Sequence, residues 1–126
     1  MVSAAPNLTR VTGTVVARSP HPTLADQDVV VLAVDGTQEV PGLRDLVGPA
    51  VARVEPRDDG LREVEIAVPR ELLGDAAPGW RLTCRVRFTP NGLMAEPRPA
   101  DDAFALRRPD LAGGLTDGGS APVSPP

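Results

Sequence analysis

Residues 59–74 read DGLREVEIAVPRELLG and indicate a strand that runs into a single turn of helix. Apolar residues alternate with charged ones over residues 63–68, as in a strand with one buried and one exposed face. Pro69 suits the first position of a helix, and Gly74 suits a helix end. The stretch therefore predicts a half-buried strand, a proline and one helical turn.

The flanking segments also read as strands. WRLTCRVRF (80–88) alternates, which points one set of side chains inward and the other outward. RVTGTVVAR (10–18) alternates too, with Gly13 marking a bulge or bend. The valine-rich DVVVLAV (28–34) predicts a strand buried on both sides. In WRLTCRVRF, the side chains expected to point inward are Trp80, Leu82, Cys84, Val86 and Phe88, and those expected to point outward are Arg81, Thr83, Arg85 and Arg87.

An earlier stretch, DGTQEVPGLRDLVG (35–48), has nearly the same order of signals as residues 59–74. It predicts a tight hairpin turn at Asp35 and Gly36, a helical turn over 41–48 and a strand over 50–56. We interpret 35–60 and 59–92 as two units of an internal duplication. Two such units packed together would close a small barrel and remove exposed sheet edges.

The expected fold class is mostly β. It is a small closed or partly open β-barrel of about six to seven strands with two one-turn helices. The barrel is expected over 8–97, between a flexible N-terminus (1–7) and a flexible, glycine- and proline-rich tail (98–126). Within that tail, 101–108 predicts a short helix capped by Asp101 or Asp102.

Composition limits the classes of function. The 126 residues carry a formal net charge of −4, which disfavours phosphate backbones unless arginines cluster locally. Lysine is absent, which is typical of a GC-rich, actinobacterial genome. The single cysteine allows no internal disulfide, and the sequence shows neither a signal peptide nor an apolar run that spans a bilayer. We therefore expect a cytoplasmic protein without a membrane partner.

The stretch VEIAVPRELLGDAAPGWRLTCRVRFTPNGLMAEP (64–97) resembles the AbrB/MazE-type swapped-hairpin segment of cradle-loop barrels. The resemblance implies a homodimeric DNA-binding regulator or antitoxin. Trp80 departs from the family pattern, which often has an acidic residue there, and the family's basic DNA-contacting residues have no clear counterparts before the first helix. The matching residues are Ile66, Pro69, Leu72, Gly74, Pro78, Gly79, Leu82, Val86, Gly92, Leu93 and Pro97.

The sequence offers few residues that could carry out catalysis. His21 is the only histidine and lacks metal-ligating neighbours, so no metal site and no cofactor is expected. Cys84 faces inward as a small hydrophobic residue. His21, Asp26 and Asp28 would line the rim if the barrel mouth held a small molecule or an active site.

Two arginine-bearing segments are the candidate binding residues. Arg81, Arg85 and Arg87 form an outward row that would grip an anionic partner, or would instead pair with Glu63 and Glu65 on a neighbouring strand.

The second segment, DDAFALRRPDL (101–111), would dock a partner through Phe104, Leu106, Arg107 and Arg108, or would instead lie on its own domain or move freely in solution. We expect a non-enzymatic accessory module that acts through protein–protein contacts. A DNA-binding regulator and a small-molecule binder or enzyme are the alternatives. Aromatic residues that would stack on single-stranded bases are missing, so a nucleic-acid partner has little support.

Overall fold

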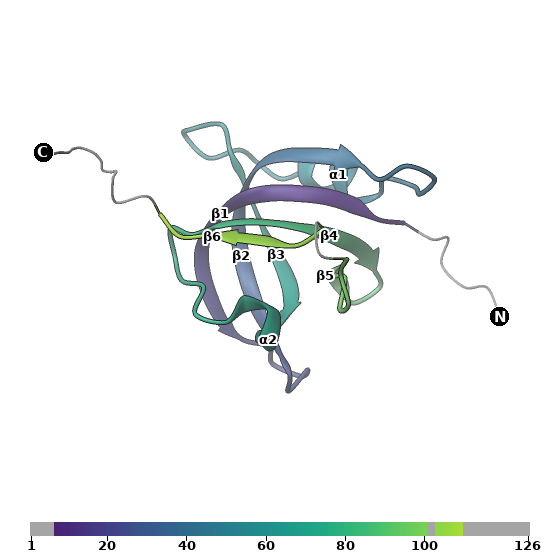
Figure 1. Ribbon diagram of the computed structural model, residues 1–126. Helices are drawn as coiled ribbons and strands as arrows, with labels where there is room; N and C mark the ends of the chain where they lie inside the picture. Colours follow the sequence, from purple (N-terminus) through teal and green to yellow (C-terminus); the bar gives the residue numbers. More distant parts are fainter. Residues whose placement is uncertain (1–6, 101–102, 110–126) are drawn as a thin grey trace, which may run out of the picture.

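Six strands and two short helices follow one another along the residues that the computed structural model describes, 7–100 and 103–109 (Figure 1). The chain is therefore mostly β, as the sequence predicts. In chain order the elements are β1 (Thr9–Pro20), β2 (Gln27–Glu39), α1 (Val47–Ala52), β3 (Arg62–Pro69), α2 (Arg70–Leu73), β4 (Arg81–Thr89), β5 (Gly92–Ala95) and β6 (Ala105–Arg107).

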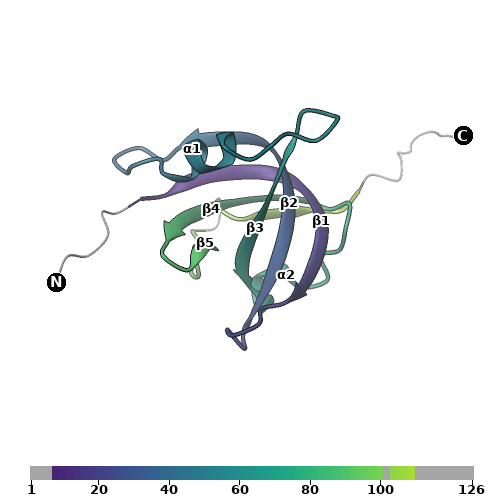
Figure 2. The same cartoon turned by 180° about the vertical axis from the view of Figure 1, so that it is seen from behind.

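Five of the strands close into a barrel in the order β1-β2-β3-β5-β4, because β4 pairs back onto β1. Strands β3 and β5 run parallel, and every other neighbouring pair runs antiparallel. The extra strand, β6, pairs with β4. Figure 2 shows the barrel from behind, with β1, β2 and β3 side by side. The expected small closed barrel is confirmed.

Strand β1 reaches both of its neighbours because the β1–β2 ladder is bulged. Thr12 pairs with Gly36 whereas Gly13 pairs with Val34, so Asp35 on β2 has no partner in the ladder. A bulge bends the strand and increases its twist, which lets β1 also pair with β4 over Thr9–Thr14. The irregularity expected at Gly13 is confirmed, with its extra residue on β2.

The hairpin turn predicted at Asp35 and Gly36 is wrong, since β2 runs without interruption through both residues to Glu39. The Asp-Gly pair lies within the strand instead, and Asp35 is the extra residue of the bulge.

The helix predicted at 41–48 and the strand predicted at 50–56 are also wrong, because α1 occupies Val47–Ala52. The Asp45 carboxylate accepts hydrogen bonds from the Gly48 N–H and the Thr9 hydroxyl, each at 2.7 Å, and so ties the first turn of α1 to β1. Pro49 lies in this first turn, where a helix tolerates it. The stretches 35–60 and 59–92 therefore have different secondary structures, which gives the duplication no support.

The core lies inside the barrel. The helices lie toward opposite ends of it (Figures 1 and 2), with Val47 and Val51 of α1 and Leu73 of α2 buried. Strand β2 differs from its prediction, because Val29 and Val31 are only half-buried on the outer face. The fully buried side chains of the strands include Val11, Val15, Val30, Leu32, Ile66, Val68, Leu82, Cys84 and Val86.

Phe88 does not face inward as expected; it is 44% exposed. At this position β4 has left the β1 ladder and pairs only with β5. The side-chain amide of Asn7 replaces the lost strand partner. It accepts from the Phe88 N–H at 2.7 Å and donates to the Phe88 carbonyl at 3.1 Å.

The short helix predicted over 101–108 is wrong, because Ala105–Arg107 form strand β6. The barrel unit therefore extends past the boundary expected at Pro97. The proposed caps Asp101 and Asp102, the N-terminal residues 1–6 and the tail from Asp110 onward lie outside the described residues.

Candidate functional site

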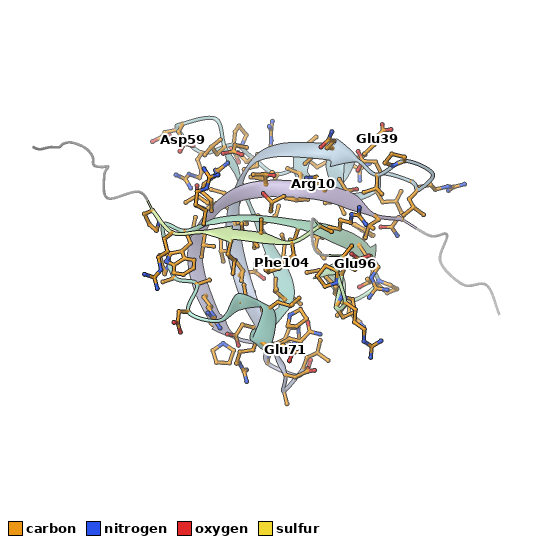
Figure 3. All side chains as sticks on the ribbon, viewed as in Figure 1. Arg10, Glu39, Asp59, Glu71, Glu96 and Phe104 are labelled. Atoms are coloured by element: carbon orange, nitrogen blue, oxygen red, sulfur yellow. The ribbon has the colours of Figure 1, made fainter. Side chains whose placement is uncertain are left out.

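An outward face with several arginines spans β1, β4 and β6. Register places Arg10 opposite Arg85, Thr12 opposite Thr83, and Arg81 opposite Arg107. Residues directly opposite in an antiparallel ladder share one face of the sheet, so these side chains form one surface. Figure 1 shows β4 and β6 side by side across the front of the barrel, and Figure 3 shows Arg10 on β1 above them. We call this surface the basic face: Arg10, Thr12, Arg81, Thr83, Arg85, Ala105 and Arg107.

Arg81 is the best-anchored residue of the basic face. Its guanidinium forms an ion pair with both oxygens of Asp35, the bulge residue of β2, and donates to the Thr14 hydroxyl at 3.1 Å. The hydrogen bond that Arg81 donates to Asp35 is the main cause of a raised Arg81 pKa. The bulge thus aims a carboxylate at Arg81 and fixes its position.

The basic face contains two shallow hollows that share Thr12. One is lined by Thr12, Arg81, Thr83, Ala105 and Arg107, and has a volume of about 230 Å³. The hydroxyls of Thr12 and Thr83 share a hydrogen bond of 3.1 Å at its floor. The second hollow is lined by Arg10, Thr12, Gly36, Thr37 and Gln38. Together they form a polar strip from β6 to β2.

The sequence placed Arg81, Arg85 and Arg87 in an outward row on β4, and their strand positions agree with it. The alternative, cross-strand pairing with Glu63 and Glu65, is wrong. Strand β3 pairs with β2 and β5 and not with β4, and Glu63 pairs with Arg57 at 3.2 Å.

Phe104 and Leu106 are not available as anchors for a partner. Both side chains are half-buried against the barrel's own core. Arg107 and Arg108 lie exposed, and the Arg108 guanidinium sits over the Trp80 ring, 5.3 Å from its centroid. For the described part of this segment, residues 103–109, the structure supports the interpretation in which it lies on its own domain.

The excess negative charge of the chain lies outside the described residues. Residues 7–100 and 103–109 hold all 13 arginines and 13 of the 17 acidic residues, so this part has no formal net charge. The other four acidic residues are Asp101, Asp102, Asp110 and Asp117. The described barrel therefore repels an anionic partner less than the overall charge of −4 suggests.

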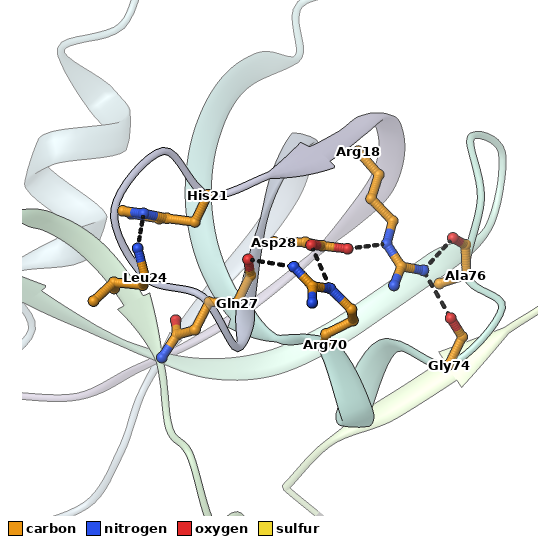
Figure 4. Close-up of polar contacts among 8 residues, drawn as sticks. All are labelled: Arg18, His21, Leu24, Gln27, Asp28, Arg70, Gly74 and Ala76. Carbon is orange, nitrogen blue, oxygen red and sulfur yellow. Dashed lines mark hydrogen bonds and ion pairs between the residues drawn. The ribbon is translucent and has the colours of Figure 1, made fainter.

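The three rim candidates differ in their surroundings. His21 Nδ1 accepts hydrogen bonds from the Thr23 N–H at 3.1 Å and from the Leu24 N–H at 3.0 Å, the latter drawn in Figure 4, and so organises the β1–β2 loop. Asp26 is exposed at the end of this loop. Asp28 is 6% exposed and accepts hydrogen bonds from Arg18 and Arg70 (Figure 4).

The Asp28 cluster is structural in character. Arg18 donates to Asp28 at 2.7 Å and to the carbonyls of Gly74 and Ala76, each at 2.8 Å. The Arg18 hydrogen bond is the main cause of a lowered Asp28 pKa. The lowered pKa favours the ionised carboxylate, and each of its oxygens accepts a hydrogen bond from an arginine. The cluster holds the loop after α2 against the β1–β2 hairpin.

Neither a reactive thiol nor a metal cluster occurs in the described part of the chain. Cys84 is buried, and burial raises the pKa of its thiol to about 12, so the nucleophilic thiolate is disfavoured. Among residues 7–100 and 103–109, no group of three or more His, Cys, Asp or Glu side chains could hold a metal ion. No helix within those ranges has the length and apolar character needed to cross a bilayer.

Comparisons with known proteins leave the site to be interpreted from its own geometry. No family model, no curated protein and no solved structure matches this chain.

Sequence reasoning missed Arg10 as a residue of the basic face and Asp35 as its neighbour. Asp35 is predicted in a turn, so its ion pair with Arg81 is not visible from the sequence. The alternation at 10–18 does not show that Arg10 lies opposite Arg85, because that position depends on the β1–β4 register.

Proposed function

We propose that this chain is a non-enzymatic binding module whose basic face receives an extended acidic segment of a partner protein. The single observation that carries the proposal is the register that brings Arg10, Arg81, Arg85 and Arg107 from three strands onto one face. Arginine donates in pairs to carboxylates, so such a face is suited to acidic side chains.

The spacing of the basic face suits an extended peptide. Its residues along β1 and β4 lie two apart, which is about 6.8 Å in an antiparallel strand. An extended peptide points every second side chain to the same side with the same repeat. Acidic residues at alternate positions would therefore meet successive rows of the basic face.

A nucleic-acid partner is the weaker candidate. The strand order resembles that of OB-type Greek-key barrels, which bind oligonucleotides on the face of their second and third strands. That face here carries Glu63 and Glu65 from β3 and two half-buried valines from β2. The basic face itself has no aromatic residue for base stacking.

The other two candidates have less support. A swapped-hairpin regulator exchanges strands between two chains, whereas β1 and β4 close this barrel within one chain. An active site at the barrel mouth would use Asp28 and His21, and both already have intramolecular partners. We place the module in the cytoplasm because its lone cysteine offers no internal disulfide.

The test compares two labelled probes on the full chain by fluorescence anisotropy: a peptide of alternating glutamate and threonine, and an oligothymidylate. We expect the peptide to bind, and the double variant Arg85→Gln, Arg107→Gln to bind it at least about tenfold more weakly. The control is Arg53→Gln, Arg98→Gln, which removes two exposed arginines outside the basic face. Binding of the oligothymidylate alone, or equal losses in both variants, would show that the proposal is wrong.

A further inference from the structure

Two arginines lie opposite each other in the β4–β6 ladder, and the guanidinium of one of them, Arg81, reaches the other way to Thr14 on β1 and Asp35 on β2. Arg81 and Arg107 are direct partners in this ladder, where Cβ atoms lie about 5 Å apart and like charges destabilise the pair. Asp35 neutralises Arg81. Within the described residues Arg107 forms no ion pair, so one positive charge of the pair remains uncompensated.

The neighbouring groups are hydrogen-bond donors. The Thr12 and Thr83 hydroxyls share one hydrogen bond, so one of their two protons is left to donate elsewhere. A hollow lined by guanidinium and hydroxyl donors selects an oxyanion over a neutral or cationic ligand.

A small side chain keeps the hollow open. Ala105 lies opposite Thr83, between the threonine pair and the end of β6. A longer side chain at this position would fill the space between Thr83 and Arg107. The hollow is therefore lined by donors from β1, β4 and β6, with the small side chain of Ala105 among them.

We propose that the hollow lined by Thr12, Arg81, Thr83, Ala105 and Arg107 binds a phosphoryl group. A phosphoryl group with several acceptor oxygens satisfies hydroxyl and guanidinium donors together, whereas one carboxylate has fewer oxygens to share among them. The group would be inorganic phosphate or a phosphorylated side chain of the partner. The second source rests on the proposed function of the basic face.

The first arm of the test titrates inorganic phosphate into the full ¹⁵N-labelled chain, with acetate as the monoanion control. We expect shifts centred on residues 83 and 105–107, and weaker binding of acetate. Arg107→Gln should weaken phosphate binding about tenfold, because it removes charge-assisted hydrogen bonds. Ala105→Glu should abolish binding by placing a carboxylate in the hollow. Both side chains are exposed, so neither variant endangers the fold.

The second arm compares peptides of one sequence that carry phosphoserine, glutamate or serine at a central position. Tighter binding of phosphoserine than glutamate, lost in Arg107→Gln, assigns the group to a phosphorylated partner. Phosphate binding without that preference assigns it to the free ion. If phosphate binds wild type, Arg107→Gln and Ala105→Glu alike, the proposal is overturned. If the glutamate peptide binds the basic face but phosphate does not, this inference fails while the proposed function stands.

Discussion

Arg18 and Asp28 form an ion pair across the β1–β2 hairpin, with 2.7 Å between the arginine Nε and the carboxylate Oδ2. Arg70, at the start of α2, donates to the other carboxylate oxygen at 2.9 Å. Because Arg18 also reaches two carbonyls beyond α2, one buried carboxylate joins the hairpin, the helix and the following loop. The stability of this end of the barrel should therefore depend on Asp28.

Replacing Asp28 with asparagine should destabilise the protein strongly. The change leaves Arg18, whose side chain is 18% exposed, without its counter-charge, and breaking a buried ion pair on one side costs about 3 kcal/mol. Urea denaturation measures the loss. The matched control is Asp26→Asn, which removes an exposed carboxylate two residues earlier and should change stability by less than about 0.5 kcal/mol. Equal effects of the two variants would contradict the structural role of the cluster.

The Asp28 cluster should also make stability depend on pH. The Arg18 hydrogen bond lowers the pKa of Asp28 in the folded state. The carboxylate therefore stabilises the fold fully above the unfolded-state pKa of about 3.9, and this contribution is lost as the pH falls through the lower, folded-state value. The gap in unfolding free energy between wild type and Asp28→Asn should be constant from pH 7 to about pH 5 and should narrow below about pH 4. A gap that widens on acidification would reverse the sign of the linkage.

Gly13 should not tolerate a side chain. A Cβ atom at this position would lie 2.4 Å from the Ala33 carbonyl oxygen, so the two backbones would have to separate at the bulge. Gly13→Ala should lower the free energy of unfolding by about 1–3 kcal/mol, the range for overpacking. Gly36→Ala is the control on the same ladder, because a Cβ atom there would meet no other atom within 4 Å. Thermal unfolding of both variants would separate the steric effect from the general loss of a glycine.

The fold class could be predicted from sequence because alternation is a local signal. Side chains alternate over 62–66 and 81–86, and both segments lie in strands as expected. The region 35–56 was predicted poorly for a physical reason. Asp35 is the extra residue of a bulge in the ladder with β1. The Asp45 carboxylate accepts hydrogen bonds from Gly48 in the first turn of α1 and from Thr9 on β1. Such signals depend on contacts with residues far away in the chain.

The candidate site was only partly predictable from sequence. The outward arginines of β4 follow from alternation, but their neighbours follow from barrel closure. The sequence suggested Glu63 and Glu65 as those neighbours because β3 precedes β4 in the chain. The Greek-key order instead places β1 and β6 beside β4, which replaces two acidic residues by Arg10 and Arg107.

Cys84 should be unreactive in the folded protein. Burial raises the pKa of its thiol to about 12, against about 8.5 for a free cysteine. Dithionitrobenzoate should react at pH 8 only after urea unfolds the chain. Since the folded state holds the proton more tightly, the stability contribution of this group should decrease as the pH rises from about 8.5 toward the folded-state value. Cys84→Ala should remove this dependence, and fast labelling of the native protein would contradict the burial.

Strand β6 should contribute to the stability of the barrel, although the sequence placed it in the tail. Leu106 is half-buried against the core, so Leu106→Ala should cost about 1–2 kcal/mol, less than for a fully buried leucine. Arg107→Ala is the control from the exposed face of the same strand and should cost less than about 0.5 kcal/mol.

A chain that ends at Pro97 extends this test to the whole strand. It should unfold at a lower temperature than either variant, because it loses Phe104, Leu106 and the stacking of Arg108 on Trp80. The emission of Trp80 should also shift to longer wavelength as its ring becomes more exposed to water. If truncation leaves the unfolding temperature and the emission unchanged, β6 does not pack on the barrel. Arg107 would then not belong to the basic face, and Ala105 and Arg107 would not line the proposed phosphoryl site.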